Sequence, residues 1–137
     1  MSSTTGLGPL RVFLRLVGVV ALLAFAAALM PDNWIVEIAQ ELGFEPFPHS
    51  PLTFYLARHL SLMYGFVGVL LLVIAADLPR YRRLVRILAA CTIAFGILQL
   101  VADSMAALPG WWTASESLST ILGGMLIGWL ERRSRPA

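Results

Sequence analysis

Residues 52–76 read LTFYLARHLSLMYGFVGVLLLVIAA, and this stretch decides the fold class of the chain. Apart from Arg58 and His59, its side chains are mostly apolar or small. At about 1.5 Å rise per residue, a helix of this length exceeds the roughly 30 Å hydrocarbon thickness of a bilayer. The stretch therefore predicts a transmembrane helix.

Three further apolar stretches accompany it, at residues 10–30, 84–108 and 114–130. In the whole chain, 58% of the 137 residues are hydrophobic and 13% are charged. A typical soluble domain carries about twice that charged fraction, so lipid is the expected solvent. We predict an all-α protein, a bundle of four transmembrane helices that forms a single integral membrane domain over residues 1–137.

The first apolar stretch also has features of a signal peptide. Arg11 and Arg15 precede its core, and residues 24–26 read Ala-Phe-Ala, a small-x-small pattern. The apolar core of a signal peptide usually has about 7 to 15 residues, and this one is longer. We therefore predict a span that stays in the protein.

The loop between the first two spans predicts a short amphipathic helix over residues 32–43. Asp32 can cap its start and Gly43 can end it. Its apolar side chains share one face and its polar side chains share the other: Trp34, Ile35, Ile38 and Leu42 against Glu37, Gln40 and Glu41. Such a helix is expected to lie flat in the membrane interface.

The other two loops are short. Residues 77–83 are rich in arginine and contain Pro79, which cannot continue a helix and is expected to stop the second span. Residues 108–113 combine a Pro-Gly pair with two tryptophans, whose side chains favour the headgroup level. We expect an interfacial turn there.

Nine of the ten arginines fall in three groups that four spans place on one side of the membrane. The groups are Arg11 with Arg15, Arg80 with Arg82, Arg83 and Arg86, and Arg132 with Arg133 and Arg135. The positive-inside rule makes that side cytoplasmic, so both termini are expected in the cytoplasm and the protein in a bacterial inner membrane. The arginines either fix only this topology or also attract anionic membrane lipid.

Polar side chains inside the spans are the candidate functional residues, because a charge in hydrocarbon costs at least about 2.5 kcal/mol. They are Arg58, His59, Gln99, Asp103 and Glu116. All are expected near the outer leaflet, where Arg58 and Asp103 lie at comparable depths and are able to pair. The layer is interpreted either as a polar clasp that fixes helix order or as a site for a ligand or an ion.

Motifs for metal, cofactor or catalytic chemistry are not found. His49 and His59 raise the question of metal or haem, but neither HExxH nor a cysteine–histidine haem attachment sequence occurs. Catalytic motifs such as a nucleophile elbow or a phosphate-binding glycine loop are lacking too. We assign no catalytic residue, metal or cofactor, expect no nucleic-acid partner, and leave enzymatic activity open while favouring none.

Small side chains on two spans indicate close helix packing. They are Ala57, Ser61, Gly65 and Gly68 on the second span and Gly124 with Gly128 on the fourth. Such positions let helix backbones approach, either within the protein or across a homo-oligomer.

The second and third spans resemble those of the BphX-like small four-helix bacterial membrane proteins. The resemblance rests on residues 55–65, which read YLARHLSLMYG, on Asp77-Leu78-Pro79-Arg80-Tyr81, and on Gly96. It implies a small membrane protein without an established activity, so it assigns no catalytic residue. It does mark Arg58 and the turn at residues 77–81 as positions of interest.

Together these observations predict an accessory subunit of a membrane complex or a binder of a lipophilic small molecule or lipid, with its site in the polar layer. A membrane redox or quinone-linked enzyme that uses His59 and nearby carboxylates is the alternative. A transporter is less favoured, because no predicted span is broken at mid-membrane.

Overall fold

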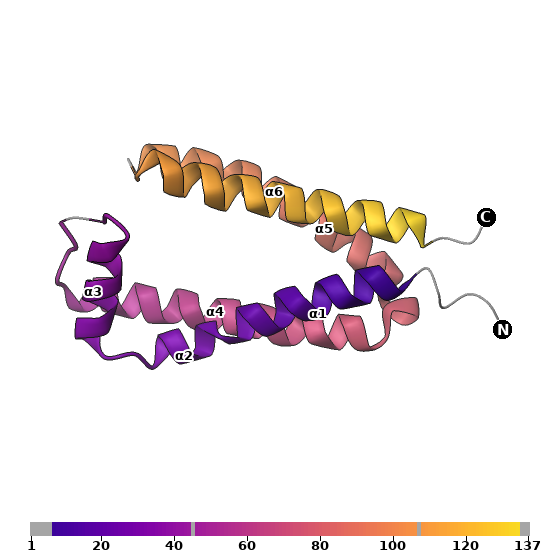
Figure 1. Cartoon of the computed structure of the whole chain (residues 1–137), viewed down its shortest axis with the longest axis horizontal. Helices are drawn as coiled ribbons and strands as arrows, with labels where there is room; N and C mark the ends of the chain where they lie inside the picture. The colour runs from indigo at the N-terminus through magenta and orange to yellow at the C-terminus, as the bar shows by residue number, and fades with distance from the viewer. Residues whose placement is uncertain (1–6, 45, 107, 135–137) are drawn as a thin grey trace. The chain divides into compact units, whose positions relative to one another are not determined.

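The computed structural model describes residues 7–44, 46–106 and 108–134, and every regular element in these ranges is a helix (Figure 1). The helices are α1 (Gly8–Leu22), α2 (Ala24–Ala28), α3 (Asp32–Glu41), α4 (Pro51–Ala76), α5 (Leu78–Met105) and α6 (Gly110–Arg133). They form two compact units, residues 14–73 and residues 7–13 with 74–134. The all-α fold class is therefore confirmed.

Three helical stretches are long and apolar enough to cross a membrane: Gly8–Ala28, which joins α1 and α2, then α4 and α5. They correspond to the first three predicted spans. Helix α6 is long enough at 24 residues, but its second and third turns contain Ser115, Glu116, Ser117, Ser119 and Thr120, which lower its apolarity. A fourth crossing stays a prediction.

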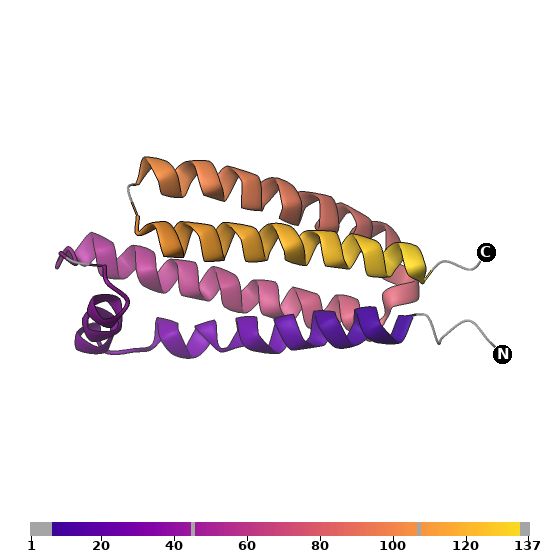
Figure 2. The same ribbon diagram turned by 45° about the horizontal axis from the view of Figure 1, so that its top comes forward.

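In the unit of residues 14–73, α1 and α4 lie side by side (Figures 1 and 2). Their backbones approach most closely where Gly18 faces Gly68. A Cβ atom built on Gly68 would lie 2.7 Å from the carbonyl oxygen of Gly18 and 2.8 Å from the amide nitrogen of Leu22. Glycine is therefore required at this crossing, as the small-residue pattern of the second span predicts.

Helix α3 lies across the axis of α4 (Figure 1). It ends at Glu41 with Leu42 as C-cap, and the next residue, Gly43, has a φ of 81°, which only glycine adopts readily. The amide of Gly43 donates to the carbonyl of Gln40, and that of Phe44 donates to the carbonyl of Ala39, both at 2.9 Å. These two bonds form a Schellman motif, which satisfies the last carbonyls of α3.

Helix α5 begins six residues earlier than predicted. Asp77 is its N-cap and accepts a hydrogen bond from the backbone N–H of Arg80 at 3.4 Å, while Pro79 occupies the first turn. Proline is tolerated there because the N–H that it lacks has no intrahelical partner. The arginine-rich segment therefore belongs mostly to α5, and α4 ends at Ala76, the predicted end of the second span, before Pro79.

We predict that Asp77→Ala lowers stability by about 1 kcal/mol, because the backbone N–H of Arg80 loses its side-chain acceptor. Thermal unfolding in detergent, followed by circular dichroism, measures the effect. Asp77→Ser keeps an acceptor oxygen and should retain most of the stability. Equal losses in the two variants would contradict the capping role.

In the other unit, α5 and α6 form an antiparallel hairpin (Figure 2). A Cβ atom built on Gly96 would lie 2.7 Å from Ile121 Cγ1, and one on Gly124 would lie 2.8 Å from Ile93 Cγ1. The tryptophan-containing segment predicted as an interfacial turn is helical from Gly110, because Pro109 serves as N-cap and Trp111 and Trp112 occupy the first turn of α6.

Candidate functional site

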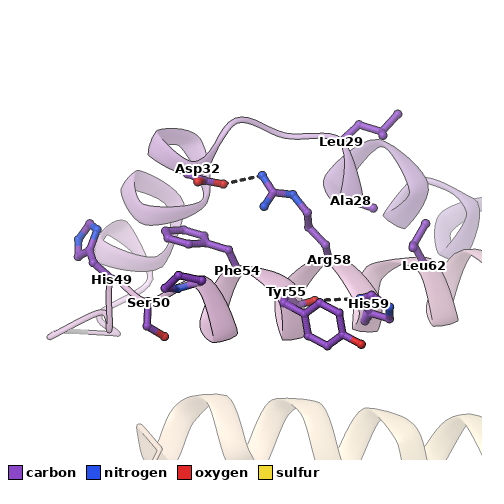
Figure 3. A pocket seen from close by; sticks show the side chains of 11 residues that line it. Ala28, Leu29, Asp32, His49, Ser50, Phe54, Tyr55, Arg58, His59 and Leu62 are labelled. Atoms are coloured by element: carbon purple, nitrogen blue, oxygen red, sulfur yellow. Dashed lines mark hydrogen bonds and ion pairs between the residues drawn. The ribbon is translucent and has the colours of Figure 1, made fainter.

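Arg58 is held by two partners in the unit of residues 14–73. Its Nη2 donates to Asp32 Oδ1 at 2.5 Å (Figure 3) and to the backbone carbonyl of Met30 at 3.0 Å. Asp32 opens α3, and Met30 lies in the connection from α2. The guanidinium therefore ties α4 to the entry of α3.

Asp32 does not cap α3 as the sequence suggested. Pro31 is the N-cap, no side-chain cap is formed, and Asp32 is the first helical residue. Its carboxylate instead turns toward Arg58 (Figure 3). A negative charge in the first turn remains favourable to the helix dipole, by about 0.3–1 kcal/mol.

A cavity of about 650 Å³ lies beside this ion pair, within the 300–1,000 Å³ range of typical ligand sites. Its walls come from α2, α3, the segment before α4, and the first three turns of α4. The lining residues are Ala28, Leu29, Asp32, His49, Ser50, Pro51, Phe54, Tyr55, Arg58, His59 and Leu62. Two of the predicted site residues, Arg58 and His59, therefore share one cavity with mainly apolar walls.

His59 is oriented by Tyr55, one turn earlier on α4. Their ring centroids are 3.9 Å apart at an interplanar angle of 34°, and His59 Nδ1 lies 3.2 Å from the carbonyl oxygen of Tyr55. Because a carbonyl only accepts, Nδ1 is the donor of this contact, which leaves Nε2 for another partner. Figure 3 shows Tyr55 and His59 leaving α4 on the side opposite the Arg58 guanidinium.

His49, the other histidine considered for metal binding, packs against aromatic rings. Its ring centroid lies 6.1 Å from that of Phe47 and 6.4 Å from that of Phe54, both edge-on. Among the described residues, no three histidine, cysteine or acidic side chains gather in a way that would hold a metal ion. His49 is therefore best described as part of the aromatic wall of the cavity.

The remaining predicted site residues lie in the α5–α6 hairpin. Gln99 Oε1 accepts from Thr120 Oγ1 at 3.4 Å. Asp103 Oδ2 is buried and has no hydrogen-bond partner among the described residues, and half-buried Glu116 lies in the second turn of α6. The hairpin thus brings Gln99 next to α6.

The single layer expected from the sequence stays a prediction, because Arg58 and Asp103 belong to different units. The carboxylate that contacts Arg58 is Asp32, which sequence reasoning assigned to a capping role. A signal was present: Asp32 is the acidic residue nearest the end of the first span, and Arg58 lies two turns into the next one. The arginine side chain is long enough to bridge such a gap.

Comparison with family models, with curated proteins and with solved structures finds no match to this chain. The resemblance to the BphX-like proteins therefore stays a prediction, and the function is argued from the geometry of the site.

Proposed function

We propose that this chain is an integral membrane protein that binds a lipophilic small molecule or lipid with a polar head, and that the cavity beside Arg58 holds the head. The observation that carries the proposal is the position of a charged guanidinium, already oriented by Asp32 and the Met30 carbonyl, on the wall of a mainly apolar cavity. Apolar walls with a few fixed polar groups are typical of sites for amphiphilic ligands.

The membrane arrangement belongs to the same proposal. Helix α6 crosses as the fourth span, at about 36 Å for 24 residues, and packs against α5 throughout. Both termini lie in the cytoplasm of a bacterium, in keeping with the arginine distribution. Helix α3 lies in the outer interface, where its exposed Trp34 and Ile38 contact lipid while Val36 and Ala39 pack inward.

Arg58→Gln tests the binding proposal. The variant keeps a hydrogen-bond donor but loses the charge, so we expect the affinity for the retained molecule to fall about tenfold or more, as for the loss of a charge-assisted hydrogen bond. Native mass spectrometry of protein released from gently solubilised membranes measures the bound mass, the copy number and any partner subunit.

Arg83→Gln is the control, because this substitution removes the same charge from an exposed position on α5. Retention of the same bound mass by Arg58→Gln, with only a loss of stability, would make the Arg58 cluster a structural clasp. A wild-type protein that carries no small molecule but retains a partner chain would support the accessory-subunit role instead.

A quinone-linked redox enzyme is the second candidate, and the orientation of His59 favours it. When the ring is neutral, Nε2 is suited to accept a hydrogen bond from a quinol hydroxyl at the cavity wall. An absorbance spectrum and solvent extraction of the purified protein distinguish the two functions. If neither the spectrum nor the extract shows quinone, haem or flavin, the redox function is left without support.

A further inference from the structure

A second groove lies between α5 and α6, at the end where α5 begins and α6 finishes, in the unit that does not contain the Arg58 cavity. Its volume is about 400 Å³, and its floor consists of small and apolar side chains. The lining residues are Arg86, Ala89, Ala90, Ile93, Gly124, Met125, Gly128, Trp129, Glu131 and Arg132. The charged ones all lie at one end.

The groove exists because small residues line it on both helices. Gly124 marks the close crossing, whereas a Cβ atom on Gly128 would meet only Ala89 Cβ, at an ordinary 3.6 Å. From Arg86 to Ile93 the floor runs two helical turns, or roughly 10 Å along the axis. One end of the groove is therefore polar and the other is apolar, as an amphiphile requires.

The charge at the polar end is positive. Glu131 is buried, and its Oε1 lies 3.8 Å from Nε of Arg86, so this arginine offsets the carboxylate. Arg132 is exposed at the rim and adds a further positive charge. Arg133 lies 4.3 Å above the ring of Trp129, and tryptophan favours the headgroup level of a bilayer. The rim therefore suits an anionic headgroup.

We propose that this groove is a binding site for one anionic phospholipid, with its phosphate at Arg86 and Arg132 and one acyl chain along Ala90 and Ile93. The charge at the rim supports this occupant over a helix of a partner protein, because Arg86 and Arg132 are both exposed at the end of the groove where an anionic headgroup would lie. Arginine-rich pockets between membrane helices suit such headgroups.

Native mass spectrometry with added lipid tests the site. The full-length protein in detergent receives equal amounts of phosphatidylglycerol and phosphatidylcholine with identical chains. We expect the wild type to retain phosphatidylglycerol preferentially. Arg132→Gln should weaken its binding about fivefold, as for one surface arginine contact, and adding Arg86→Gln should weaken it further, because Glu131 then lacks its offsetting charge. Arg83→Gln, which removes an exposed charge outside the groove, should leave binding unchanged.

The chain-binding part has its own pair of variants. Ala90 is exposed within the groove, so the leucine of Ala90→Leu fills the groove without entering the helix crossing. This variant should bind both phosphatidylglycerol and phosphatidylcholine more weakly. Ala94→Leu lies one turn further along α5 and outside the groove, so it should leave the binding of both lipids unchanged. Arg132 and Ala90 are both exposed, so neither variant depends on a buried contact.

Three results would overturn the proposal. Equal losses in Arg132→Gln and Arg83→Gln would show that the basic face holds lipid as a whole. An unchanged Ala90→Leu would show that no chain enters the groove. Displacement of the lipid by millimolar glycerol phosphate would show a site for a soluble anion. Arg58→Gln should retain the phospholipid, so failure here and failure of the Arg58 cavity are separately observable.

Discussion

Gly124→Val is expected to lower the stability of the α5–α6 hairpin by about 3 kcal/mol, near the upper end of typical overpacking costs. Even its Cβ atom would lie 2.9 Å from the amide nitrogen of Ile93 and 3.0 Å from the carbonyl oxygen of Ala89. Both atoms are backbone, so no rotamer change relieves the clash, and the helices must separate. Unfolding in increasing SDS, followed by tryptophan fluorescence, measures the loss.

Gly123→Val is the matched control, because it makes the same chemical change one residue earlier on the same helix. A Cβ atom on Gly123 meets no atom within 4 Å. Its effect should stay within about 0.5 kcal/mol, as for most substitutions away from packed contacts. Comparable losses in the two variants would mean that α5 and α6 do not cross at Gly124.

Gly68→Val should have a similarly large effect on the packing of α1 against α4. The nearest atoms to its Cβ would be the carbonyl oxygen of Gly18 at 2.7 Å and the amide nitrogen of Leu22 at 2.8 Å. A loss of about 3 kcal/mol is expected in the same SDS titration, because the two backbones must move apart. Near-ultraviolet circular dichroism should report the change in aromatic packing.

Gly65→Ala provides a graded comparison on the same helix. Its Cβ atom would meet the ring of Phe25, at 2.5 Å, rather than backbone. This ring packs edge-on against Phe66 with centroids 5.3 Å apart, and it can shift by rotating about its side-chain torsions. Gly65→Ala should therefore cost clearly less than Gly68→Ala. The reverse order would place the close approach of α1 and α4 elsewhere.

Helix packing was the part of the tertiary structure most accessible from sequence. Gly65, Gly68 and Gly124 were predicted to mark close packing, and each lies where a Cβ atom would clash. Their contacts are within the chain, one of the two alternatives considered. Gly128 has room for a Cβ atom, so the spacing of Gly124 and Gly128 alone did not distinguish a crossing from a groove.

The start of α5 was harder to predict from the sequence. Apolarity places the third span from residue 84, because hydropathy identifies the part of a helix that lies in lipid and not the part that extends into the headgroups. The six additional residues are helical because Asp77 caps them and Pro79 is tolerated in a first turn. The arginines at 80, 82 and 83 therefore lie on helix α5 and not in a loop.

The sequence by itself determined the helical class and the three stretches that are long and apolar enough to cross a membrane. A backbone in hydrocarbon must satisfy its hydrogen bonds within each segment, which a helix does. These are local properties, and apolar length is enough to reveal them. Which carboxylate contacts Arg58 was decided only by the tertiary structure. Arg58 and Asp32 are 26 residues apart, and they meet because α3 folds back across α4. Such a contact depends on where two helices cross and on how far a side chain reaches, which hydropathy and spacing do not encode.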